Sequence, residues 1–508
     1  MAVLCGPIVE VLMSRGIEDP DMFIAPAKWD DLPSPFTIEG MNQAATEITK
    51  AVSLQQRIGI FGDYDCDGVL STAILQATLR RLNVEPLVYL PHRDEGYGLI
   101  HSAVHFFSRH QTNLLITIDN GINALGPVHL AQRLGIDVVV VDHHHIETRA
   151  NTTAVWSPDF SAAGLALLLA WALLDNAGLP EDDALPFLRS LSRLSAIASI
   201  ADCVPLVGAT RTLTKIGLAE LAHTRHAGLR KMLLMAGVAD QEVPTSEQIA
   251  FRVAPRINAA GRVGHPKVAL DMLNAPSQER QIELALSLDH LNRDRRRQEK
   301  EALDQLPLLV PEVIPAGLVV YGPQWRKGIA GILASRVRER YGVPAFVLVR
   351  DPRTGLAVGS GRSIEGISLI DALRSCSTIL TKFGGHHQAA GVTLAVENIP
   401  AFQEQFAAFL CCHPPLLCES PKADANLDLS MVSRAFRSQL RSLEPFGIGN
   451  PTPLFRLKDV EVRRASEQFV IIRQRGRELK ARCTQLVGGK GTAVVGLNGT
   501  SAYLASFS

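Results

Sequence analysis

The stretch Ile58–Leu70, which reads I-G-I-F-G-D-Y-D-C-D-G-V-L, constrains the fold more than any other. An apolar run rich in β-branched residues leads into three aspartates at alternate positions, Asp63, Asp65 and Asp67. Alternation at period two predicts that the three carboxylates leave an extended chain on one side, where they repel and raise each other's pKa values. A cation would hold them ionised together, and carboxylate oxygens suit Mg²⁺ or Mn²⁺. A solvated acidic turn is the alternative, which the strand-like run before it and the helix-like pattern after it disfavour.

Three further apolar runs, which we interpret as strands, end at acidic residues or histidines. The runs and the residues that end them are Leu114–Ile118 with Asp119, Val138–Val141 with Asp142, His143, His144 and His145, and Ser195–Ile200 with Asp202. Because the carboxyl ends of parallel strands meet at one edge of an open α/β sheet, these groups are predicted to lie together. The sequence therefore predicts a metal site at that edge.

Composition bounds the class of protein. A chain of 508 residues is long enough for two to four domains, each with its own core. The net charge is zero, so any binding of a nucleic acid would depend on local basic patches and not on the overall charge of the protein. The eight cysteines form no C-x-x-C pair, which argues against a disulfide framework or a zinc site. The N-terminus lacks a signal-peptide pattern, and the longest apolar run, Ala162–Leu174, is too short to span a bilayer, so we expect a buried helix there and a cytoplasmic protein without a membrane contact.

Strand and helix patterns divide the chain into five segments. We expect an N-terminal cover over 1–45, an α/β domain over 46–280, a long connecting helix over 281–310, a smaller α/β domain over 315–412, and a β-barrel over 424–508 after a linker with Pro414, Pro415 and Pro421. The strands of the first domain are continuously apolar, which predicts burial on both faces and hence a parallel sheet. In the smaller domain, glycine-rich turns are predicted at Gly359–Ser363 and Gly384–Gly391.

Seven motifs occur in a fixed order: G-D-Y-D-C-D-G, I-D-N-G-I, D-H-H, A-D-C-V-P-L, P-R-I-N-A-A-G-R, G-S-G-R-S and G-G-H-H-Q-A-A-G. This ordered set resembles the DHH phosphoesterase superfamily and, within it, the RecJ family of single-stranded-DNA-specific exonucleases. The resemblance implies a DHH catalytic domain, a smaller DHH-associated domain, a cleft between them, and an OB-fold that grips single strands. The chain departs from the family at Phe61, at His145–Thr148, and in its short C-terminal barrel, whose completeness is open.

The resemblance also implies residue roles. The metal ligands would be Asp65, Asp67, Asp119, His143 and Asp202, with Asp119 bridging two Mn²⁺ or Mg²⁺ ions. Asp63 would be a further ligand or a residue that orients one, Asp142 would orient a histidine, and His144 would face the scissile phosphate. Cys66 and Cys203 are interpreted as packing residues. In the second domain His386, Gly384 and Gly385 would contact substrate, whereas His387 is incidental. A terminal-phosphate pocket would contain Arg93, Arg262, Ser360 and Arg362; Arg256 is a weaker candidate, because it can instead pack against the first domain.

The function implied is a 5′→3′ exonuclease that hydrolyses single-stranded DNA with two metal ions and releases 5′ mononucleotides, in DNA repair and recombination. The alternative is a phosphodiesterase for short oligonucleotides or cyclic dinucleotides, whose members lack the C-terminal barrel. An inactive DNA-binding scaffold is disfavoured because every expected acid is present. A single-strand-binding protein and a helicase are partners implied by the family alone.

Overall fold

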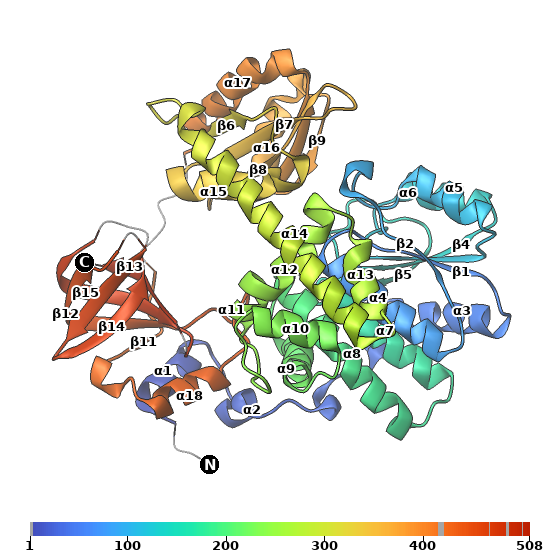
Figure 1. The fold of residues 1–508 in the computed structure, drawn as a ribbon, viewed down its shortest axis with the longest axis horizontal. Coiled ribbons are helices and arrows are strands. Elements are labelled where there is room, and N and C mark those ends of the chain that lie inside the picture. The colour runs from blue at the N-terminus through green and yellow to red at the C-terminus, as the bar shows by residue number, and fades with distance from the viewer. Residues whose placement is uncertain (1–3, 415–420, 467, 484–486, 500, 508) are drawn as a thin grey trace.

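The computed structural model describes residues 4–414, 421–466, 468–483, 487–499 and 501–507. Part of the expected linker, including Pro415, therefore lies outside the described residues, as does the last residue of the expected barrel segment, Ser508. Figure 1 shows two α/β bodies connected by a long helix, and a β-barrel beside the first body. Within the described residues, no helix is both long and apolar enough to cross a bilayer.

The first body is built on a five-stranded sheet whose order is β2-β1-β3-β4-β5 and whose pairs are all parallel. Its strands are β1 (Ile58–Phe61), β2 (Leu87–Tyr89), β3 (Leu114–Ile118), β4 (Asp137–Asp142) and β5 (Thr153–Trp156). The helices around it are α3 (Met41–Ser53), α4 (Cys66–Arg81), α5 (His101–Arg109), α6 (Leu125–Arg133) and α7 (Ala162–Asn176). The buried strands confirm the predicted parallel sheet, and α7 is the predicted buried helix.

A helical layer follows the sheet in sequence. It contains α8 (Glu181–Ala201), α9 (Gly208–Ala222), α10 (Ala227–Met235), α11 (Ser246–Gln248), the π-helical turn η4 (Ile249–Val253), α12 (Ala254–Val263) and α13 (Lys267–Asn274). The prediction that Ser195–Ile200 is a strand is wrong, because this run forms the last turns of α8. Its side chains are buried within the helical layer, and a short apolar run does not distinguish a buried helix from a buried strand.

The long helix α14 (Gln278–Gln305) leads into the second body. That body has a sheet of order β6-β7-β8-β10-β9 with β6 (Leu318–Tyr321), β7 (Ala345–Arg350), β8 (Ala357–Arg362), β9 (Lys382–Gly385) and β10 (Ala389–Leu394), and helices α15 (Lys327–Tyr341), α16 (Leu369–Ser375) and α17 (Ile399–Cys412). The predicted glycine-rich turns are largely strands. A Cβ at Gly361 would lie 2.4 Å from the Phe346 ring. Glycine is therefore required at this position by the close packing of β8 against β7, and not by a turn.

The C-terminal barrel closes. Its strands are β11 (Ala425–Asn426), β12 (Leu454–Arg464), β13 (Phe469–Gln474), β14 (Arg477–Arg482), β15 (Gly489–Leu497) and β16 (Ala502–Phe507), and β12 pairs with β15 as well as with β13. Helix α18 (Arg434–Ser442) lies between β11 and β12 in the chain. We expected 1–45 to cover the first domain, but the first helix, α1 (Gly6–Ser14), buries Ile8 and Val11 in the barrel core, while Trp29 and Met41 join the core of the first domain. The N-terminal segment thus contacts both the barrel and the first body.

Candidate active site

The acidic turn after β1 bends into a helix. Asp65 is the N-cap of α4 and accepts a hydrogen bond from the Gly68 N–H at 3.0 Å, whereas Asp67 already belongs to the first helical turn. Asp67 accepts the N–H groups of Ala162 and Ala163 at 2.7 and 2.8 Å, at the start of α7. The expectation that all three aspartates leave one extended chain is therefore wrong, because helix formation redirects Asp67.

The acids nevertheless converge on one histidine. His143, directly after β4, has its Nε2 3.3 Å from Asp119 Oδ1, 3.4 Å from Asp202 Oδ2 and 3.7 Å from Asp67 Oδ2. Asp119 follows β3 with a left-handed backbone (φ 64°), and its N–H donates to the Val141 carbonyl at 2.9 Å. The strand ends of β1, β3 and β4 and the end of α8 thus meet in one cluster.

The cluster fits a divalent metal. The buried Nε2 of His143 and Oδ1 of Asp63 have no hydrogen-bond partner among the described residues. Three sets of side chains each offer ligand atoms within 4.8 Å of one another: Asp63, Asp65 and Asp119; Asp67, His143 and Asp202; and Asp119, His143 and His144. Hard carboxylate oxygens with imidazole nitrogen suit Mn²⁺ or Mg²⁺. Asp119 and His143 each belong to two of the sets, and the 3.3 Å contact between them joins the first set to the second.

Burial and mutual repulsion shift the pKa values in the cluster. Burial, together with neighbouring carboxylates, raises the pKa of Asp67 to about 7 and that of Asp202 to about 8, and raises the pKa values of Asp63 and Asp119 well above the usual range. Burial lowers the pKa of His143 to about 4, so its imidazole is neutral and available as a ligand at neutral pH. A cluster of this kind needs added positive charge to be fully ionised.

His144 is held as a cation. Its Nδ1 lies 2.7 Å from Asp142 Oδ1, and although burial opposes the charge, this hydrogen bond and the surrounding carboxylates raise its pKa to about 9. Asp142 also accepts the N–H of His143 at 2.8 Å and that of Ile122 at 3.0 Å. The hydroxyl of Tyr97 lies 2.6 Å from His144 Nε2, a contact that the sequence reasoning missed. The only signal in the sequence is that glycines flank Tyr97 on both sides, a pattern that indicates an unusual loop conformation.

We expect the metal-free protein to lose stability as the pH rises from about 6.5 to 9. Above pH 6.5 the unfolded chain has released protons that the folded state keeps on Asp67 up to about pH 7, on Asp202 up to about pH 8 and on His144 up to about pH 9, so the free energy of unfolding falls with pH. The check is the thermal unfolding midpoint of chelator-treated protein at both ends of the window. Asp202→Asn should reduce the fall and saturating Mg²⁺ should remove it. An equal fall in Asp202→Asn and in the unchanged protein would contradict the assignment.

Guanidinium groups from both α/β bodies gather beside the cluster. Arg93 lies 4.0 Å over the Tyr64 ring and donates to the Gly261 carbonyl at 3.0 Å; Arg262 donates to the Gly328 carbonyl at 3.2 Å. Arg362 on β8 donates to the Ser360 hydroxyl at 2.9 Å. Burial and the nearby charges of Arg93, Arg295 and Arg362 lower the pKa of Arg262 to about 10. Arg256 instead pairs with Asp289 of α14 at 2.9 Å and braces the helical layer.

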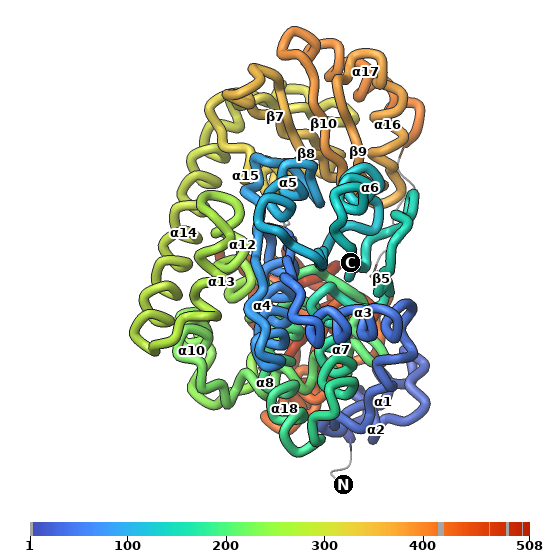
Figure 2. Tube along the Cα trace, turned by 90° about the vertical axis from the view of Figure 1, so that its right-hand side faces the viewer, coloured from blue at the N-terminus to red at the C-terminus, as the bar shows by residue number. Residues whose placement is uncertain are grey.

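The second body contacts the first body through a pair of histidines. The rings of His386 and His145 lie 6.5 Å apart, and Figure 2 shows the second body above the first. A Cβ on Gly384 would meet open space, so its backbone is accessible, whereas Gly385 adopts φ 134°, which favours glycine. His387 turns away, with Nδ1 2.8 Å from the Ser368 hydroxyl. Asn258, inside the P-R-I-N-A-A-G-R motif, accepts the Cys66 N–H at 2.9 Å and was not singled out from sequence.

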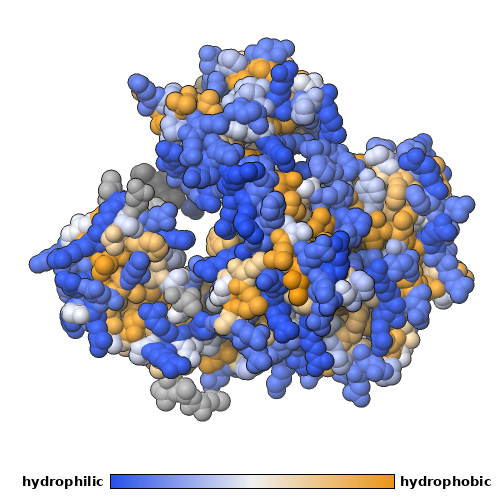
Figure 3. Space-filling view, viewed as in Figure 1, coloured by the Kyte–Doolittle hydropathy of each residue, from blue (hydrophilic) through white to orange (hydrophobic). Residues whose placement is uncertain are grey.

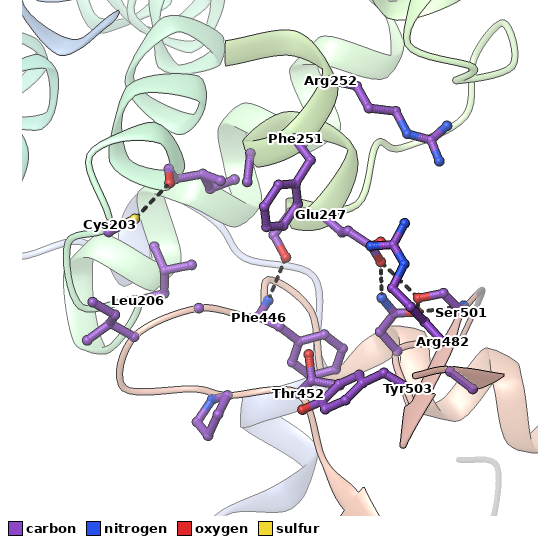
Figure 4. A pocket seen from close by; sticks show the side chains of 18 of the residues that line it. Cys203, Leu206, Glu247, Phe251, Arg252, Phe446, Thr452, Arg482, Ser501 and Tyr503 are labelled. Carbon is purple, nitrogen blue, oxygen red and sulfur yellow. Dashed lines mark hydrogen bonds between the residues drawn. The ribbon is translucent and has the colours of Figure 1, made fainter. Parts of the chain in front are cut away.

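A groove of about 1000 Å³ lies between the helical layer of the first body and the barrel. Figure 3 shows the molecule hollowed between the barrel and the other two bodies, and Figure 4 shows the side chains that line the groove. One end is formed by Cys203, next to Asp202, and the other by Lys480, Arg482 and Tyr503 of the barrel. Phe251 of η4 projects from the wall and is 70% exposed. Exposed rings beside cations are typical of surfaces that bind single-stranded nucleic acid.

A parallel sheet with acids and a histidine pair at its carboxyl edge, facing a second α/β domain, defines a DHH-type phosphoesterase. Three family models match in order: "DHH family, N-terminal domain" over 57–198, "DHHA1 domain" over 314–410 and "RecJ OB domain" over 423–495. The chain belongs to the RecJ family. It is 34% identical to the single-stranded-DNA-specific exonuclease RecJ of Escherichia coli over 82% of this chain and 78% of that protein.

Two other RecJ proteins are similar to this chain, but the chain covers a smaller share of their length. The Bacillus subtilis RecJ is 33% identical over 88% of this chain, but the chain spans only 58% of that protein, and 63% of the Thermus thermophilus one. The crystal structure of RecJ from Thermus thermophilus in complex with Mn²⁺ superposes with a TM-score of 0.82 at 29% identity and covers 99% of this chain and 75% of that one. A second structure of that protein contains Mg²⁺.

Proposed function

We propose that this chain is a 5′→3′ exonuclease that hydrolyses single-stranded DNA at a two-metal site and releases 5′ mononucleotides. The observation that carries the proposal is the convergence of Asp67, Asp119 and Asp202 on the orphaned Nε2 of His143, in a chain of the RecJ family. The two ions would be held by Asp63, Asp65 and Asp119 on one side and by Asp67, His143 and Asp202 on the other. When bound, they supply an activated water and stabilise the leaving oxygen.

The residues around the ions have separate tasks. His144 carries a proton on Nε2 at neutral pH, because Asp142 holds its Nδ1–H, and so offers a positive charge to a phosphate. Asp142 in turn fixes both histidine backbones through their N–H groups. The contact of His386 with His145 and the accessible backbone at Gly384 support a substrate contact from the second domain.

The direction of cleavage would come from the terminal phosphate. A terminal phosphate carries more charge than an internal one, and arginine forks bind it with paired, charge-assisted hydrogen bonds. Arg93, Arg262 and Arg362 with the Ser360 hydroxyl lie between the domains beside the cluster, where a 5′ end would be seated. The rest of the strand would follow the groove past Phe251 to the barrel.

Strands labelled at the 5′ or the 3′ end, 5 or 40 nucleotides long, test the proposal with Mn²⁺ present. We expect the 5′ label to appear at once as a mononucleotide, the 3′ label to shorten stepwise, and duplex ends to resist. The phosphodiesterase alternative predicts cleavage of the 5-mer and of cyclic dinucleotides with the 40-mer left intact. Release of the 3′ label first would contradict the assigned polarity.

A further inference from the structure

The loop Leu443–Pro451 before the barrel contains the sequence P-F-G-I-G-N-P, and the proposed chemistry gives it no role. We refer to it as the docking loop. It lies against the segment Asp202–Val207, which connects α8 to α9, and it forms part of the groove wall in Figure 4. The Leu206 N–H donates to the Ile448 carbonyl at 2.7 Å, and a Cβ on Gly449 would lie 2.7 Å from Val207 Cγ1. The barrel side of the molecule thus fixes one end of a six-residue connection whose other end is Asp202.

Asp202 differs from the other acids of the cluster in how it is held. Asp65 and Asp67 accept backbone N–H groups at helix starts, and Asp119 is fixed by its own N–H within the sheet. Within the described residues, the Asp202 carboxylate has one polar contact, to His143, and it follows the last turn of α8. Cys203 after it is left-handed (φ 59°), so the connection leaves the helix abruptly. The last turn of α8 holds the start of the connection, because the N–H groups of Asp202 and Val204 donate to the Ala198 and Ser199 carbonyls at 2.9 and 3.3 Å, and the docking loop holds its far end at Leu206.

The docking loop is built to be rigid. Asn450, which is buried, donates to the Leu443 and Pro445 carbonyls at 2.9 and 2.7 Å and accepts from Arg15 at 2.7 Å.

Arg211 of α9, four residues beyond Val207, donates to the carbonyls of Leu443, Glu444 and Pro445 at 3.0, 3.0 and 3.2 Å. Glu444 accepts from the Ser246 hydroxyl at 2.8 Å. The same hydroxyl accepts the N–H of Phe446 at 3.0 Å, and Figure 4 draws the bond at Phe446. Loop, α9 and α11 form one braced unit around the connection.

We propose that the docking loop is a positioning element for the metal ligand Asp202, and that the barrel is thereby coupled to metal binding. Residues that orient a ligand through its surroundings typically change metal affinity by about ten-fold or more. The inference rests on the proposed function for the identity of the site. Its test uses Mn²⁺ binding without any nucleic acid, so a failure of the exonuclease assignment would leave the test readable.

The experiment is calorimetric titration of Mn²⁺ into the chelator-treated full chain. Asn450→Ala removes the brace of the loop, and Gly449→Ala strains a left-handed position (φ 78°) against Val207, so either variant should raise the apparent Kd about ten-fold. Arg441→Ala is the matched control. It removes another contact between the barrel side and the first domain, to Glu242 at 2.9 Å, away from the connection, and should leave the Kd unchanged.

A double-mutant cycle separates positioning from general loosening. If Asn450 acts through Asp202, the pair Asp202→Asn and Asn450→Ala should bind Mn²⁺ no more weakly than Asp202→Asn alone. Additive losses in the pair, unchanged affinity in both loop variants, or an equal loss in Arg441→Ala would each overturn the proposal. Should Asn450→Ala not fold, as judged by circular dichroism, the same cycle is run with Gly449→Ala.

Discussion

Asp119→Asn should lower the rate of strand hydrolysis by at least about 100-fold, while the affinity for single-stranded DNA stays close to that of the unchanged protein. Asp119 belongs to the set proposed for one ion, and its Oδ1 lies 3.3 Å from His143 Nε2, which belongs to the set proposed for the other ion, so removing its charge should affect both proposed ions. Asparagine is preferred to alanine because the position is left-handed (φ 64°), a region that asparagine tolerates. In the proposed function, strand binding would rest on the groove and on arginines elsewhere, so it should persist.

The matched control is Asp137→Asn, an exposed acid at the opposite end of the neighbouring strand β4. It should change neither activity nor binding. The metal-free Asp119→Asn variant should unfold at no lower temperature than the unchanged protein, because the substitution removes a carboxylate whose pKa burial raises. Hydrolysis above a few per cent of the original rate with added Mn²⁺ would contradict the bridging role.

Arg362→Ala should slow cleavage of 5′-phosphorylated strands at least about ten-fold more than cleavage of 5′-hydroxyl strands. The guanidinium lies beside the Ser360 hydroxyl on β8 and close to the buried Arg262, so cations converge where a terminal phosphate would bind. Arg362→Lys keeps the charge but loses the paired hydrogen bonds, and should fall between the two.

Initial rates on the two substrates, taken with and without the substitution, measure the effect. Arg374→Ala, an exposed arginine of the same domain that pairs with Asp371 at 2.6 Å, is the control and should leave the ratio of the two rates unchanged. If Arg362→Ala slows both substrates by one factor, the arginine stabilises the cleft and does not read the terminal phosphate.

The parts of the fold that were predicted correctly are those in which the hydrophobicity and the length of a run are compatible with only one type of secondary structure. Continuously apolar runs such as Leu114–Ile118 gave strands of a parallel sheet, and Ala162–Leu174 gave a helix buried on all sides. The run Ser195–Ile200 is also buried but belongs to a helix, because only tertiary packing decides the state of so short a run. The glycines of β8 were predicted as a turn because the close approach of Phe346 is invisible in one sequence.

In the candidate site, too, some features could be predicted from the sequence and others could not. Strand-end acids and the pair His143-His144 could be assigned because their chemistry and their place in the motifs coincide. The redirected Asp67 and the contact of Tyr97 with His144 could not, since both depend on where a helix starts or a loop folds back. The domain limits and the individual residue roles stay predictions.

Anomalous scattering from crystals of the full chain soaked in Mn²⁺ tests the two-metal site most directly. We predict two peaks in the cluster, one among Asp63, Asp65 and Asp119 and the other among Asp67, His143 and Asp202, with an oxygen of Asp119 within bonding distance of both. A single peak at saturating Mn²⁺, or two peaks of which only one contacts Asp119, would contradict it.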